Sequence, residues 1–368
     1  MAHPEWLDRL ELEHDNFRLA LNYLIKTGDA EWGLRLGAAL FHFWETREHL
    51  SEGRDFITRL LSMKERNARP KLRARLLFAG AILMGEQGDY ASARKLLEES
   101  LDTSIELKDH RGAAVALNAL AAHARDRGEL ANATILFERC VAIWKALGDA
   151  ADIARSLSNL ANVMKLRGEH ASALSLYDEC LTMFRKAGDN AGVAWTLNYQ
   201  GDVAREKSDF VAARSFCEQS LVAFRQLRDG WGIASALSDL AGLCSDQGFN
   251  AEARRLYGES VKLFRELGHK RGIARVLECL AADAAAQSNA ELSLRLAGAA
   301  AALRQQLGAP LTPAEQPRLE KALEFARRTL GTAAGLTAWM AGFSMPVQEA
   351  VEEALGRAEA NPKVQTSA

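Results

Sequence analysis

The sequence predicts an all-α protein on the strength of three observations. The chain has 368 residues and seven prolines, but no proline lies between residues 71 and 309. That stretch is rich in Ala, Leu, Arg and Glu, which favour helices. Its apolar residues recur at steps of three and four, so each segment carries one apolar stripe. The third observation is an internal repeat of 40 residues, which predicts stacked supersecondary units.

The repeat keeps a strict register in six units. One column holds Ala74, Ala114, Ala154, Ala194, Ala234 and Ala274. A second column holds Leu77, Leu117, Leu157, Leu197, Leu237 and Leu277. A turn column holds Gly88, Gly128, Gly168, Ser208, Gly248 and Ser288. Because two helices in close contact need short side chains where they cross, each unit is expected to be an antiparallel helix pair. A lone pair cannot bury its stripe, so the six pairs are expected to stack into a right-handed solenoid.

Composition excludes several functional classes. The 46 Lys and Arg residues nearly balance the 48 Asp and Glu residues, which speaks against direct nucleic-acid binding or a polybasic membrane surface. No apolar stretch reaches the roughly 18–20 residues that span a bilayer, and the N-terminus has no signal-peptide core. An odd set of five cysteines without C-x-x-C spacing predicts a reduced, cytoplasmic protein. They are Cys140, Cys180, Cys217, Cys244 and Cys279.

The order of small residue, glycine, alanine and aromatic within one unit resembles the tetratricopeptide repeat (TPR). In the third unit these residues are Ala161, Gly168, Ala173 and Tyr177. The typical TPR period is about 34 residues, so the 40-residue units here are longer. Arg185 also stands near the place of the usual late proline. Both departures resemble the long-helix TPR variety of large bacterial signalling proteins.

Segments at both ends extend the resemblance to bacterial ATP-dependent regulators of the STAND type, related to the maltose regulator and to NB-ARC ATPases. The segments are WLDRLELEHDNFRLALNYLI, FHFWETREHLSEGRDFITRLL and AWMAGFSMPVQEAVEEALG. In those relatives the TPR array is the sensor of an ATPase switch. The chain has no G-x-x-x-x-G-K-[ST] motif and no basic recognition helix. The resemblance therefore implies a sensor or interaction module, with the effector half upstream or on another chain.

The pattern predicts four regions. Residues 1–68 are expected to form N-terminal helices and a divergent first TPR, and residues 69–307 the six repeats. Three prolines then break the pattern, and residues 308–360 are expected to form capping helices near 314–330, 332–343 and 346–359. Residues 361–368 are expected to be a frayed tail.

A search for catalytic and metal motifs predicts a protein that is not an enzyme and holds no cofactor or metal. The eight histidines never form H-E-x-x-H, and G-x-S-x-G is absent. Cys140 and Cys180 share one column. They are either a redox pair or small buried hydrophobic residues, and the second interpretation is favoured because one full repeat separates them.

In the TPR family the first helix of each pair lines a concave groove, and this resemblance selects the candidate binding residues. Asn can donate to and accept from a peptide backbone, Arg suits carboxylates, and Trp is an amphipathic anchor. The candidates are Arg75, Asn118, Arg125, Arg155, Asn162, Lys165, Trp195, Asn198, Asp202, Arg205 and Glu206.

Two functions fit this pattern. The first is a scaffold that binds a protein or peptide partner in the groove, in a signalling or transcriptional regulator. The alternative is a sensor of a sugar or nucleotide-like molecule that controls an ATPase on the same or another chain. For any one of these residues the alternative is a solvated inner face that binds no partner. Self-association through the aromatic N-terminal segment or an exposed end is a further possibility.

Overall fold

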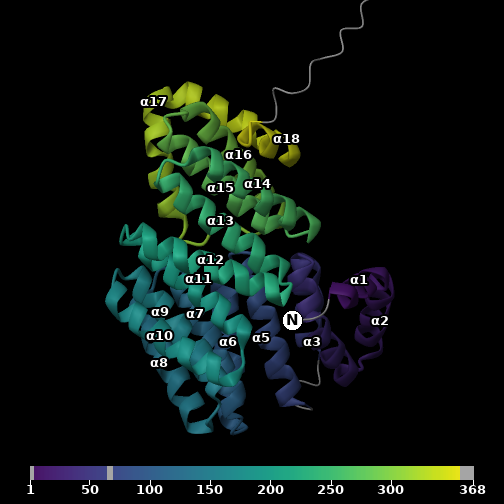
Figure 1. The fold of residues 1–368 in the computed structure, drawn as a ribbon. Coiled ribbons are helices and arrows are strands. Elements are labelled where there is room, and N and C mark those ends of the chain that lie inside the picture. The colour runs from purple at the N-terminus through teal and green to yellow at the C-terminus, as the bar shows by residue number, and fades with distance from the viewer. Residues whose placement is uncertain (1–3, 64–68, 357–368) are drawn as a thin grey trace, which may run out of the picture. The chain divides into compact units, whose positions relative to one another are not determined.

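A computed structural model describes residues 4–63 and 69–356 (Figure 1). Within these ranges the chain forms 18 helices and no strand, so the all-α prediction is confirmed. Figure 1 shows the helices in chain order, from α1 in purple to α18 in yellow. The predicted frayed tail, residues 361–368, lies outside the described residues.

Four helices precede the 40-residue repeat: α1 (Pro4–Leu12), α2 (His14–Thr27), α3 (Ala30–Thr46) and α4 (Leu50–Leu61). The first helices of the six pairs are α5 (Pro70–Glu86), α7 (His110–Asp126), α9 (Ala150–Leu166), α11 (Asn190–Glu206), α13 (Gly230–Asp246) and α15 (Lys270–Ala286). The second helices are α6 (Tyr90–Glu106), α8 (Leu130–Leu147), α10 (His170–Ala187), α12 (Phe210–Leu227), α14 (Asn250–Glu266) and α16 (Ala290–Leu307).

The turn column has the backbone conformation that its residues predict. All six residues of that column have a positive φ, including Ser208 at 60° and Ser288 at 62°. Glycine adopts this left-handed conformation without a steric penalty, whereas serine does so at a cost. The turn between two pairs is closed by a side-chain cap in several repeats. Asp109 is an example, because its Oδ1 accepts a hydrogen bond of 3.0 Å from the Gly112 N–H.

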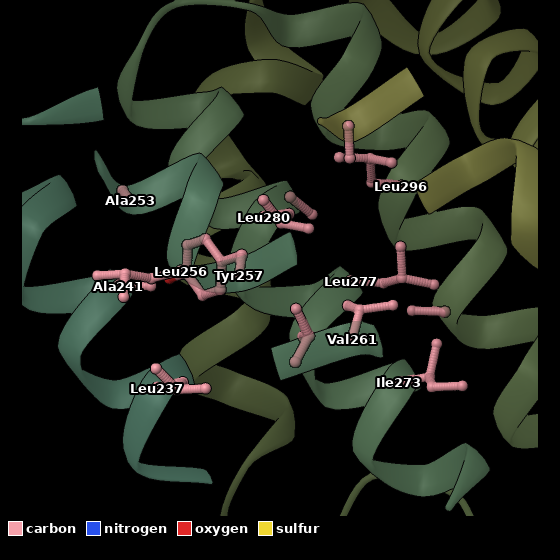
Figure 2. Packing of buried hydrophobic residues seen from close by; sticks show 14 of the residues in the cluster. Leu237, Ala241, Ala253, Leu256, Tyr257, Val261, Ile273, Leu277, Leu280 and Leu296 are labelled. Carbon is pink, nitrogen blue, oxygen red and sulfur yellow. The ribbon is translucent and has the colours of Figure 1, made fainter. Parts of the chain in front are cut away.

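The chain divides into two compact units, which are described separately here. The first comprises the described residues up to Glu179 together with Gly308–Thr312, and the second runs from Cys180 to Leu307 and continues from Pro313. In the first unit Leu77, Ala81, Leu97 and Phe137 are fully buried. In the second, side chains from α13, α14, α15 and α16 gather between the helices (Figure 2).

Short side chains let the two helices of a pair approach closely. Five of the six alanines in the first column have no exposed surface, and Ala74 has 7%. The approach is close enough for a hydrogen bond between helices. Ser100, Ser220 and Ser260 each donate one to the backbone oxygen of the column alanine 26 residues earlier.

This serine position explains Cys140. Its Sγ lies 3.2 Å from the Ala114 carbonyl oxygen and makes the contact that serine makes in other pairs. Burial raises the pKa of the Cys140 thiol, which disfavours the reactive thiolate. All five cysteines are free. The interpretation as a small buried residue therefore holds for Cys140.

The repeat pattern ends in two further helices, α17 (Gln316–Phe343) and α18 (Val347–Ala354). Gly331 has φ 74° and ψ 174°, so α17 is broken at the boundary that the sequence predicts between 330 and 332. Helix α18 is shorter than the predicted 346–359, because it ends at Ala354, two residues before Gly356 with φ 68°.

Candidate functional site

The candidate binding residues all lie on the first helices of the pairs. Six of them belong to the first unit, on α5, α7 and α9, and five belong to the second unit, on α11. Arg75, Arg155 and Glu206 are exposed, and Asn198 is buried. The other seven are partly buried, as expected of a lined face: Asn118, Arg125, Asn162, Lys165, Trp195, Asp202 and Arg205.

In the first unit, asparagines of neighbouring repeats bond to one another. The Asn159 Nδ2 donates to the Asn118 Oδ1 at 3.1 Å. The Asn162 Oδ1 accepts a hydrogen bond of 2.9 Å from the Tyr177 hydroxyl. Because both candidate amides use an oxygen inside the protein, their amide N–H groups are the donors that could reach a ligand.

Two of the three candidate arginines of the first unit are paired with nearby carboxylates. An Arg125 nitrogen lies 2.8 Å from Asp126, and an Arg155 nitrogen lies 2.5 Å from Asp152. Exposed ion pairs of this kind contribute little to stability, but they neutralise the positive charge that would otherwise attract a carboxylate ligand. The first unit is therefore a weaker anion site than the sequence suggests.

The second unit holds a polar network that sequence reasoning missed in part. The Asn198 Nδ2 donates to the Asp239 Oδ2 at 2.8 Å, and an Arg275 Nη donates to the Asp239 Oδ1 at 3.0 Å. Burial raises the pKa of Asp239, although the Arg275 charge opposes the shift. The Arg275 side chain remains 52% exposed, and its guanidinium has further N–H donors besides the one that Asp239 accepts.

Two polar atoms beside this network have no hydrogen-bond partner among the described residues. They are the buried Asn198 Oδ1 and the Ser238 Oγ. A buried acceptor without a partner costs about 1–3 kcal/mol, so such atoms are uncommon in stable proteins. Both atoms are buried, so the part of this network that lies at the surface is the half-exposed Arg275 guanidinium.

A second charged cluster lies further along the same helices. The Arg205 Nε lies 2.5 Å from the Asp246 Oδ2, so this candidate cation is already paired. Gly242 leaves room for its guanidinium, because a Cβ there would come within 3.0 Å of the Arg205 Nη2. Burial raises the pKa of Asp283 to about 6. Hydrogen bonds from Ser245 and Tyr257 oppose this shift.

Aromatic side chains gather at the start of α11 and α13. The Trp195 ring centroid lies 4.6 Å from that of Trp231 and 4.7 Å from that of Phe224. Trp231 is 42% exposed, while Phe224 is fully buried. The sequence selected Trp195 but not Trp231. The signal that could have found Trp231 is its position at the start of a first helix, where the core columns have not begun.

Comparisons with known proteins agree with this architecture. The tetratricopeptide repeat family model matches residues 72–146 and 152–226, so the chain contains tetratricopeptide repeats. No curated protein matches the chain in sequence. No helix among the described residues is both long and apolar enough to cross a membrane.

Three solved structures share the fold. The apo form of RapI is 14% identical, with a TM-score of 0.58 over 72% of this chain and 96% of that chain. NprR in complex with its cognate peptide NprX is 14% identical, with a TM-score of 0.54 over 97% and 93%. A STAND protein with a tetratricopeptide repeat sensor, from Pyrococcus horikoshii, is 18% identical, with a TM-score of 0.53 over 96% of this chain and 53% of that chain.

Proposed function

We propose that this tetratricopeptide-repeat protein is a non-catalytic scaffold that holds an extended peptide of a partner protein against its first helices. The observation that carries the proposal is the Asn198–Asp239–Arg275 network, in which Asp239 holds a half-exposed guanidinium. An extended peptide backbone presents N–H and C=O groups in alternation. Arg275 is half exposed and can donate to a peptide carbonyl or carboxylate, while the buried Asn198 amide helps to hold Asp239 in place.

The network is held in place before any ligand arrives. Asp239 fixes both the Asn198 amide and the Arg275 guanidinium through its two oxygens. Side chains that are already ordered lose less conformational entropy on binding. The aromatic pair Trp195 and Trp231 adds an apolar surface, since Trp231 keeps 42% of its surface exposed. Tryptophan and arginine are the residues that most often dominate binding energy at interfaces.

The structural relatives support the peptide class and a regulatory setting. NprR was solved with its cognate peptide, and a Rap protein was solved with competence and sporulation factor. The STAND relative carries its tetratricopeptide repeats as a sensor. By analogy, we propose that this chain is the sensor or interaction module of a cytoplasmic signalling or transcriptional regulator.

We also propose the domain organisation that the sequence pattern suggests. Residues 69–307 would be the repeat array, residues 1–68 an N-terminal extension with a divergent first repeat, and residues 308–360 a C-terminal cap. The burial of Leu323, Ala326 and Ala338 on α17 supports a capping role, because these residues cover the apolar face of the preceding helices.

A small-molecule sensor needs an enclosed polar cavity, and the first unit offers a poor one. An open hollow of about 590 Å³ lies between the starts of α5 and α7. Two of the cations that line it are already paired: Lys71 with Asp109 at 3.0 Å, and Arg69 with Glu31 at 2.8 Å. Known ligand pockets bury most of their ligand. The peptide scaffold is therefore the better-supported function.

The test uses peptides selected on the full chain from a random display library. A triple variant, Trp195→Ala, Asn198→Ala and Arg205→Ala, is expected to abolish their binding while the helical circular dichroism is retained. A second variant, Arg275→Lys, keeps the charge beside Asp239 but removes the forked donor, and at least a tenfold loss is expected.

The control is a matched triple variant on the second helices, Ile135→Ala, Val211→Ala and Val222→Ala, whose side chains are all more than half exposed. It is expected to bind like the wild type. Failure to select any peptide, or equal binding by the first-helix triple variant, would refute the proposal. A melting temperature raised by a sugar or nucleotide but by no peptide would favour the small-molecule sensor instead.

A further inference from the structure

The N-terminal helices bring two histidines and a glutamate together, away from the first-helix site. Glu11 lies near the end of α1, His14 begins α2, and His49 is the residue before α4. One potential ligand atom from each residue lies within 4.8 Å of the other two. We propose that Glu11, His14 and His49 bind a divalent transition-metal ion, with Zn²⁺ the best match to two imidazoles and one carboxylate.

The distances suit a shared ion. The His49 Nε2 lies 3.1 Å from the Glu11 Oε1, and the His14 Nδ1 lies 3.9 Å from the same oxygen. Two ligands that each lie about 2.0–2.1 Å from a tetrahedral ion are roughly 3.3 Å apart. The two imidazole rings are also close to each other, with centroids 4.4 Å apart. Small side-chain rotations therefore suffice to close the site around an ion.

The second ring nitrogen of His14 is already oriented. Its Nε2 lies 2.5 Å from the Glu52 Oε1, so the Nε2–H donates to the carboxylate and the neutral imidazole keeps the Nδ1 lone pair for a metal. A carboxylate behind a metal-bound histidine is a recurring feature of zinc sites, because it fixes the tautomer and the ring direction. Here Glu52 is itself held by Arg18 at 2.6 Å and by the Trp44 indole N–H at 3.3 Å.

The aromatic neighbours of His14 also limit the orientation of its ring. The Phe43 ring packs edge-on against His14, with centroids 5.0 Å apart, and restricts the imidazole further. Glu11 and His49 remain 42% and 28% exposed, so an ion can enter from solvent.

The ion would fasten α1 to the body of the first unit. Helix α1 exposes Trp6 and Leu12, and an ion pair between Asp8 and Arg47 is another link to the rest of the chain. An ion bound by Glu11 and by the two histidines on other segments would add a stronger link. Three protein ligands leave a fourth tetrahedral position for water or for a group from a partner.

A search for linear motifs could not find this site. The Glu11-x-x-His14 spacing is present, but its third ligand lies 35 residues further along the chain. A tight H-E-x-x-H motif puts two histidines on one helix, whereas these two come from different segments. The site depends on the packing of α1, α2 and α4.

The experiment titrates the full chain, without a histidine tag and stripped of metal, with Zn²⁺ against a chromophoric zinc indicator. Co²⁺ in place of Zn²⁺ reports tetrahedral coordination by its visible absorption. One ion per chain is expected. His49→Ala and Glu11→Gln should each abolish this binding, and Glu52→Gln should weaken it 10–100-fold. The Glu11 side chain is 42% exposed, so its variant tests the site with less effect on folding than a variant of the buried His14 would have.

The matched control is His42→Ala. His42 lies on α3 with a single carboxylate partner, Glu45, at 3.0 Å, and its side chain is 56% exposed. This variant should keep one ion per chain. The proposal is wrong if the wild type binds no Zn²⁺ at this stoichiometry, if His49→Ala binds like the wild type, or if His42→Ala loses the ion.

Discussion

Helices α16 and α17 cross with their backbones in contact, and two glycines make this crossing possible. A Cβ placed on Gly342 would lie 2.7 Å from the Arg295 Cα and closer still to its carbonyl oxygen. A Cβ placed on Gly298 would meet the backbone of Trp339 and Phe343 in the same way. Non-bonded carbons normally approach to about 3.5–4.0 Å. Gly342→Ala must therefore push the two helices apart by roughly 1 Å.

The free-energy cost follows from these distances. Overpacking costs about 1–3 kcal/mol, and the upper end applies because a backbone cannot rotate out of the way as a side chain can. Alanine returns up to about 1 kcal/mol through its higher helix propensity. Gly342→Ala is thus expected to destabilise the second unit by about 2 kcal/mol. At 2–4 °C per kcal/mol, its melting temperature should fall by about 4–8 °C.

Gly335 on the same helix is the matched control. A Cβ there would lie 3.4 Å from the Leu294 Cδ1, which is an ordinary contact with a flexible side chain. Gly335→Ala is therefore expected to raise stability by up to about 1 kcal/mol. Both variants can be compared by thermal unfolding followed by circular dichroism at 222 nm. Equal melting temperatures for the two variants would show that the crossing is not limited by backbone contact.

Three other variants test the packing and the electrostatics. Asp283→Asn removes a carboxyl whose pKa is about 6 in the folded state and about 3.9 in the unfolded state. The protonated carboxyl therefore contributes to the stability of the fold at acidic pH, and this contribution is lost as the pH rises from about 4 to 6. The variant should gain stability relative to the wild type over that window, by up to about 2–3 kcal/mol, and a constant difference in melting temperature across it would contradict the pKa. Ser208→Gly relieves the positive φ of 60° and should stabilise the second unit by about 1 kcal/mol in calorimetry, with no gain counting against strain there. Tyr177→Phe deletes the hydrogen bond to Asn162 and should cost about 1 kcal/mol in urea unfolding, and an unchanged midpoint would mean that the bond contributes nothing.

The fold could be predicted because it depends on residues that repeat in the chain. Each column alanine lies at the same crossing, so one pattern determines six buried contacts. The break at Gly331 could also be predicted from the sequence, since glycine tolerates the positive φ that interrupts a helix. The end of α18 at Ala354 could not be predicted in the same way, because the sequence that follows it could also continue as a helix.

The candidate site was predicted less completely, because the polar residues that contact each other are not separated by the 40 residues of the repeat. Asn118 contacts Asn159, Asn198 contacts Asp239, and Arg205 contacts Asp246, so each pair is separated by 41 residues. A search at a shift of 40 assigns such partners to different columns and leaves each as an isolated polar residue.

This one-residue offset decides which polar groups remain for a ligand. Where two members of an offset pair satisfy each other, as Arg205 and Asp246 do, neither has its full hydrogen-bonding capacity left. Asn198 differs because its partner is a carboxylate, and an ionised carboxylate can only accept hydrogen bonds. Asp239 therefore accepts from the Asn198 amide N–H and leaves the Asn198 amide oxygen unpaired. The same carboxylate holds Arg275 by one Nη, and the guanidinium has further donors. An acid at position 239 thus orders both the buried Asn198 amide and a half-exposed donor, Arg275, which is why the second unit has the stronger claim to a ligand.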